Sequence, residues 1–93
     1  MYLLGIDIGS SSIKAALVDA RTGKTAGIAS APDTEMDILA LRPGWAEQDP
    51  DEWWLHVCAA TKQLLENTLL APAEIKGIGI SYQMHGLVVV GED

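Results

Sequence analysis

Apolar positions in the first third of the chain predict three short strands. Residues 2–9 are almost continuously apolar, which is typical of a strand that is covered on both faces. Residues 13–20 and 25–31 are predicted as the next two strands, joined by a hairpin loop at 21–24 that contains a glycine. Because the turn at 10–12 is also short, we expect these strands to form an antiparallel meander.

A loop at 32–48 is followed by clear signals for the start of a helix. Asp49 is a favourable N-cap, Pro50 suits the first helical position, and Glu52 would complete a capping box. Pro72 lies just beyond the predicted end of the helix. Residues at helical spacing predict the stripe that faces the core: Trp54, Val57, Cys58, Thr61, Leu65 and Thr68.

The last part of the chain returns to a strand pattern. Residues 75–82 are predicted as a fourth strand, residues 83–86 as a turn and residues 87–90 as a fifth strand. A turn signal after 90 with nothing following it suggests that the chain is part of a longer protein. The predicted order is β-β-β-α-β-β, with a parallel, right-handed crossover through the helix. The expected fold is α/β, a mixed sheet with a helix on one face.

Composition narrows the choice of function. The chain has 93 residues, enough for one small domain, and a formal net charge of −7. Its few Lys and Arg residues form no cluster, which argues against a nucleic-acid partner. A single cysteine, Cys58, excludes an intramolecular disulfide, and we expect it in the core. Without an apolar run near 20 residues or a signal peptide, we expect no membrane partner and a cytoplasmic location.

The turn after the first strand is the first candidate site. Its polar and flexible residues are Asp7, Gly9, Ser10, Ser11, Ser12 and Lys14. Asp7 lies between two glycines on one face of the strand, so no bulky neighbour covers it. Successive N–H groups of such a turn can bind a phosphate, Lys14 could reach it, and Asp7 could hold Mg²⁺ through water. An ordinary β-turn capped by Asp7 is the alternative, and the residues alone leave both open.

Three motifs resemble known families. The pattern D-x-G-S-x-x-x-K at 7–14 is similar to the first phosphate motif of the actin-like ATPase superfamily. The segment PGWAEQDP at 43–50, followed by two tryptophans, resembles the signature of the FGGY carbohydrate kinases. The segment GISYQMHG at 79–86 resembles the strand and loop that meet the sugar in that family, in the form of its xylulokinase branch. Glycerol kinases typically carry Arg-Glu where this chain has Met84 and His85.

The resemblance implies a ribonuclease H-like, actin-like ATPase domain that belongs to an ATP-dependent kinase with Mg²⁺ as cofactor. Residues 1–93 would be the beginning of the first FGGY domain, while the family's catalytic-base aspartate and adenosine pocket come later. The reaction would transfer the γ-phosphate of ATP to D-xylulose and give D-xylulose 5-phosphate. Another ketose or polyol (ribulose, gluconate, glycerol) and a non-catalytic actin-like nucleotide-binding module remain alternatives, and a homodimer remains open.

The same resemblance assigns roles to individual residues. Asp7 would be the catalytic and metal-binding carboxylate, with the turn residues and Lys14 around the phosphates. Gln83, Met84 and His85 would contact the sugar, because a neutral imidazole can donate to one hydroxyl and accept from another. We interpret the segment around Trp45 as structural, since tryptophans beside a capped helix usually pack.

Overall fold

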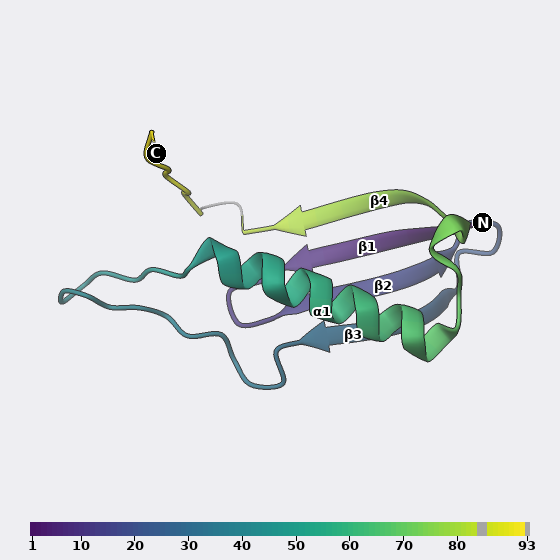
Figure 1. Ribbon diagram of the computed structural model, residues 1–93, viewed down its shortest axis with the longest axis horizontal. Coiled ribbons are helices and arrows are strands. Elements are labelled where there is room, and N and C mark those ends of the chain that lie inside the picture. The colour runs from purple at the N-terminus through teal and green to yellow at the C-terminus, as the bar shows by residue number, and fades with distance from the viewer. Residues whose placement is uncertain (84–85, 93) are drawn as a thin grey trace.

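The computed structural model describes residues 1–83 and 86–92, and its first three strands agree closely with the sequence prediction (Figure 1). Its elements are β1 (Tyr2–Ile8), β2 (Ile13–Asp19), β3 (Thr25–Ala31), α1 (Pro50–Thr68), a 3₁₀ turn (Pro72–Glu74) and β4 (Ile75–Tyr82). Every predicted strand from 2 to 82 is confirmed to within about one residue at each end. In the described part of the chain, no helix is both long and apolar enough to cross a membrane.

The four strands form one mixed sheet in the order β3-β2-β1-β4. Strand β2 is antiparallel to both β1 and β3, whereas β4 runs parallel to β1. Helix α1 links the two edge strands and lies across one face of the sheet, where it contacts β2 and β3 (Figure 1). The expected mixed sheet with a helix on one face is confirmed, and it places the ends of β1 and β4 side by side.

The core lies between α1 and the sheet. Strand alternation turns Leu4 of β1 and Ile13 and Leu17 of β2 toward the helix, where the exposed fractions of Ile13 and Leu17 are 0%. Ala60 and Leu64 meet them from the helix. Asp7 is exposed on the opposite face, as the parity of the strand predicts.

The predicted core stripe of α1 is confirmed only in part, because Val57 packs against the core but two other members of the stripe are exposed. Trp54 is 69% exposed and Cys58 is also exposed, while the helix packs through Trp53, Ala60 and Leu64. Apolar residues go almost all the way round this helix, so the sequence permits two neighbouring stripes. Close packing of α1 against β2 and β3 decides between them, because the buried side chains of the helix must fit the surface of the sheet.

The start of α1 is confirmed at Asp49, but the predicted capping box is wrong. The Asp49 side chain accepts a hydrogen bond from the Asp51 amide at 3.0 Å. The amide of Glu52 donates instead to the backbone oxygen of Asp49, also at 3.0 Å. Since that amide is already paired with the main chain, it is not available to the cap side chain.

The predicted fifth strand at 87–90 is not formed. Leu87, Val89 and Val90 have exposed fractions of 84%, 80% and 83%. A strand needs a neighbouring backbone for its hydrogen bonds, and none of the described residues runs beside this segment. High β-propensity alone therefore does not make it a strand.

One apolar row of the sheet is left uncovered by the helix. Ile78, Ile80 and Tyr82 of β4 lie in register with the helix-facing residues of β1, yet they are 63%, 61% and 70% exposed. They are exposed because α1 packs mainly on β3 and β2, on the side of the sheet away from the β4 edge.

Candidate functional site

Four polar side chains form a row across the sheet on the face opposite the helix. Asp7 of β1 lies opposite Lys14 of β2 and Ser81 of β4, and Lys14 lies opposite Ser30 of β3. Paired positions of neighbouring strands place their side chains on the same face. The sheet register thus brings the predicted carboxylate and cation together.

The surface beside this row is built from small residues. Gly5 and Gly79 are paired across β1 and β4, and a Cβ atom added to either would meet nothing within 4 Å. A shallow hollow here is lined by these glycines together with Asp7 and Lys14. A ligand could therefore approach both charged side chains and the backbone of the sheet.

The donor set fits a hydrated magnesium ion rather than a closed protein cage. No group of three or more His, Cys, Asp or Glu side chains gathers anywhere within residues 1–83 and 86–92. Mg²⁺ usually keeps several waters and binds through one or two carboxylates plus substrate phosphates. Asp7, exposed beside the open hollow, suits that mode of binding.

The turn between β1 and β2 is closed tightly by Gly9. Its amide donates to the backbone oxygen of Ser12 at 3.0 Å, and a Cβ atom on Gly9 would lie 3.0 Å from that same oxygen. The sequence analysis placed Gly9 among the flexible residues of a turn that can bind a phosphate. The structure adds a local reason, since a side chain would push against the turn itself.

Gln83 meets the turn after β1, which the sequence did not predict. It was assigned to the sugar, but its Nε2 donates to the backbone oxygen of Gly9 at 3.3 Å. This contact joins the loop after β4 to the turn after β1, as expected for neighbouring strand ends. The predicted sugar contacts Met84 and His85 lie outside the described residues.

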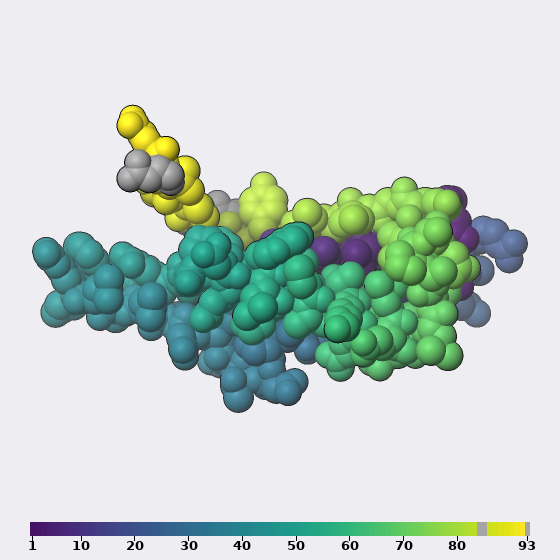
Figure 2. Space-filling view, in the orientation of Figure 1, coloured from purple at the N-terminus to yellow at the C-terminus, as the bar shows by residue number. Residues whose placement is uncertain are grey.

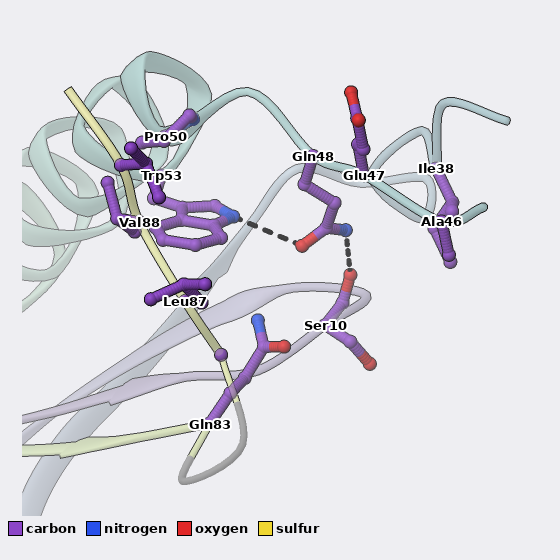
Figure 3. A pocket seen from close by; sticks show the side chains of 12 residues that line it. Ser10, Ile38, Ala46, Glu47, Gln48, Pro50, Trp53, Gln83, Leu87 and Val88 are labelled. Atoms are coloured by element: carbon purple, nitrogen blue, oxygen red, sulfur yellow. Dashed lines mark hydrogen bonds between the residues drawn. The ribbon is translucent and has the colours of Figure 1, made fainter. Parts of the chain in front are cut away.

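Gln48 is a further site residue, which the sequence analysis included only as part of the structural segment around Trp45. Its Nε2 donates to the backbone oxygen of Ser10 at 2.5 Å, while its Oε1 accepts from the indole of Trp53 at 3.1 Å (Figure 3). Its position directly before the N-cap Asp49 was the only signal that could have suggested a fixed side chain.

The surrounding segment supports the structural interpretation of the Trp45 motif. The Arg42 guanidinium lies 5.0 Å from the centre of the Trp45 ring. The backbones of Leu39 and Glu47 pair through hydrogen bonds of 2.6 and 2.7 Å. These contacts stiffen the loop that carries Gln48 to the turn.

A pocket lies beside Gln48 at one end of the molecule. Figures 1 and 2 show the 32–48 loop and the C-terminal segment projecting from this same end. Both segments line the pocket, together with Ser10, Trp53 and Gln83 (Figure 3). The turn after β1 thus borders this pocket through Ser10, while Asp7 and Lys14, on the strands that flank the turn, line the hollow on the open face of the sheet.

The mixed sheet with a helix on one face belongs to the actin-like ATPase fold. The crystal structure of a xyloylose kinase from Brucella ovis superposes with a TM-score of 0.82 and 37% identity, over 92% of this chain and 17% of that one. The profile of the FGGY family of carbohydrate kinases, N-terminal domain, matches residues 2–93. The chain belongs to the FGGY family of carbohydrate kinases, as its motifs predicted.

The curated relatives are described as kinases of more than one substrate. A xylulose kinase from Staphylococcus epidermidis is 35% identical over 98% of this chain and 18% of its own length. A glycerol kinase from Xanthomonas campestris is 40% identical over 95% of this chain and 17% of its own length. The chain spans less than a fifth of the length of these relatives.

Proposed function

We propose that residues 1–93 are the N-terminal part of the first domain of an ATP-dependent kinase that phosphorylates D-xylulose to D-xylulose 5-phosphate. The observation that carries the proposal is the junction of β1 and β4. There the Gly9 backbone oxygen accepts a hydrogen bond from Gln83, so a phosphate turn and the start of a sugar loop lie in contact. Family membership supports phosphoryl transfer from ATP.

In this proposal the chain supplies the phosphate side of the reaction. Bound Mg²⁺ would neutralise charge on the transferring phosphoryl group, and Asp7 would hold the ion through water. The amides and hydroxyls of Ser10, Ser11 and Ser12 and the ammonium of Lys14 would stabilise the same group. A carboxylate from another part of the kinase would take the proton of the sugar hydroxyl.

The sugar side would be placed by the loop after β4. Gln83, Met84 and His85 form the QMHG sequence that resembles the xylulokinase branch. Relatives described as xylulose kinases support that substrate. The relative described as a glycerol kinase supports a second candidate function, a kinase for glycerol or another polyol. We propose a cytoplasmic location for the enzyme, in line with the free thiol of Cys58 in this chain.

A substrate panel tests this function. The complete kinase would be supplied with ATP and Mg²⁺, and ADP release would be measured with D-xylulose, D-ribulose, gluconate and glycerol. We expect D-xylulose to give the highest kcat/KM. A higher value for glycerol would establish the alternative, and an absence of sugar-dependent ADP release with every substrate would contradict the proposed function.

A further inference from the structure

All four backbone oxygens of the turn at 9–12 accept hydrogen bonds. Gln83 donates to Gly9 at 3.3 Å and Gln48 donates to Ser10 at 2.5 Å. The amide of Met36 donates to Ser11 at 2.8 Å, and the amide of Gly9 donates to Ser12 at 3.0 Å. Three of the four donors come from segments outside the turn. The conformation of the turn is therefore set by contacts with the 32–48 loop and with the end of β4.

Fixing these oxygens also fixes the amides of the turn. In a planar trans peptide the C=O and the following N–H point in opposite directions. The bonds to Gly9, Ser10 and Ser11 therefore orient the N–H groups of Ser10, Ser11 and Ser12 away from the donors. Among the described residues, none of these three amides donates a backbone hydrogen bond of its own. They remain available to an anion.

The side-chain amide of Gln48 is itself held in one orientation. The Trp53 indole is only a donor and the Ser10 backbone oxygen is only an acceptor, so the side chain between them must both accept and donate. A glutamine amide meets that need, whereas a carboxylate or a thioether does not. Trp53 packs partly buried against the core, which anchors the chain of contacts to α1.

We propose that Gln48 and Gln83 are positioning residues that hold the amides of Ser10, Ser11 and Ser12 toward the phosphates of ATP. Gln48 fixes the turn to the start of α1 through Trp53, and Gln83 fixes it to the loop after β4. This inference rests on the proposed function, because it takes the turn as the phosphate site. It gives the Trp45 segment a purpose beyond packing, which is to carry Gln48 to the turn.

The main test is Gln48→Met in the complete kinase. Methionine has a similar length but cannot donate to Ser10, and it adds no charge. We expect kcat/KM for ATP to fall about five- to 100-fold, because the Ser10 backbone oxygen and the Trp53 indole would both lose their hydrogen-bond partner. The KM for the sugar should change less than about twofold, since no sugar contact is lost.

A matched control separates positioning from a general loss of structure. Gln63 is an exposed residue of α1, so Gln63→Met makes the same chemical change away from the turn. We expect this control to keep wild-type kinetics and the wild-type thermal midpoint. A Gln48→Met enzyme with wild-type ATP kinetics, or with ATP and sugar constants changed equally, would overturn the inference.

A second variant covers the case in which Gln48→Met fails to fold. Trp53→Phe keeps an aromatic ring but removes the indole donor, so it releases Gln48 without cutting its bond to Ser10. We expect a loss in kcat/KM for ATP that is smaller than for Gln48→Met and again spares the sugar KM. Unchanged ATP kinetics in this variant would count against the inference.

Failure of the proposed function can be told apart from failure of this inference. If the wild-type protein releases no ADP with any sugar, the proposed function fails. The inference is then judged by calorimetric titration with Mg-ATP alone. An increase in Kd of about five- to 100-fold in Gln48→Met would support it. An equal Kd, or no binding by the wild-type protein, would overturn it.

Discussion

Asp7 and Lys14 show how much a single pair of residues depends on strand register. They are seven positions apart in the sequence, yet β1 and β2 pair them directly on the open face of the sheet. Gly5 and Gly79 leave space above them. At the residue scale, the Asp7 carboxylate and the Lys14 ammonium are both accessible to a ligand, so substitutions at these two positions give the most direct kinetic tests of the site.

We expect Asp7→Asn in the complete kinase to act mainly on kcat. The substitution keeps the shape of the side chain but removes the charge that would hold the metal near the phosphoryl group. Loss of such electrostatic stabilisation typically lowers the rate about 10²- to 10³-fold. Steady-state kinetics with ATP and sugar varied in turn provides the measurement. Near-normal turnover with a raised sugar KM would place Asp7 in the sugar site instead.

The assignment of His85 to the sugar remains a sequence-based prediction. We expect His85→Ala to lower kcat/KM for D-xylulose about five- to 150-fold, because a buried sugar hydroxyl would lose its partner. The KM for ATP should change little. Circular dichroism would establish that the variant is folded. An unchanged sugar constant in a folded enzyme would show that His85 is an ordinary loop residue.

At the scale of elements, the close contact of α1 with β3 decides which face of the helix is buried. A Cβ atom on Gly27 of β3 would lie 2.6 Å from Cγ2 of Thr68 and 3.1 Å from Cδ1 of Leu64. Leu64 is only 1% exposed, so it has no free space to move into. The glycine is therefore part of the packing between helix and sheet.

We expect Gly27→Ala to lower the free energy of unfolding by about 1–3 kcal/mol, the usual range for overpacking in a core. Gly79→Ala is the matched control, because a Cβ atom there meets nothing within 4 Å. Denaturant unfolding of both variants in the complete kinase provides the comparison. Equal stability of the two would show that the helix can shift to accept the extra methyl group.

At the scale of the whole molecule, much apolar surface is exposed. Ile78, Ile80 and Tyr82 of β4 are each more than 60% exposed, as are Leu87 and Val90 beyond the sheet. In the proposed function, further segments of the kinase would cover this surface, because large exposed apolar patches usually mark contact surfaces.

We expect the 93-residue chain by itself to show no measurable sugar kinase activity. The reason is that the family resemblance places the base for the sugar hydroxyl outside these residues, which would hold only the phosphate side of the proposed site. A coupled assay for ADP release on highly purified chain tests the expectation. Sugar-dependent release that disappears in the Asp7→Asn chain would contradict it, since contaminating kinases would not respond to that substitution.

Local patterns in the sequence determined most of the elements. Alternating and continuous apolar runs located β1 to β4, and Asp49 with Pro50 located the start of α1, because these signals depend on neighbours in the chain. The three motifs also identified the FGGY family, which the family profile confirmed. The roles of the predicted site residues stay predictions.

Only the tertiary structure decided which helix face is buried, whether 87–90 pairs, and how the turn after β1 is held. Each of these depends on residues far apart in the sequence. Gln83 lies 74 positions from Gly9, and Gln48 lies 38 positions from Ser10. Propensity and periodicity depend on residues that are close together in the sequence. Packing and long-range hydrogen bonds depend on how distant segments meet in space. The sequence thus determined the elements and the family, and the contacts between elements decided the geometry of the candidate site.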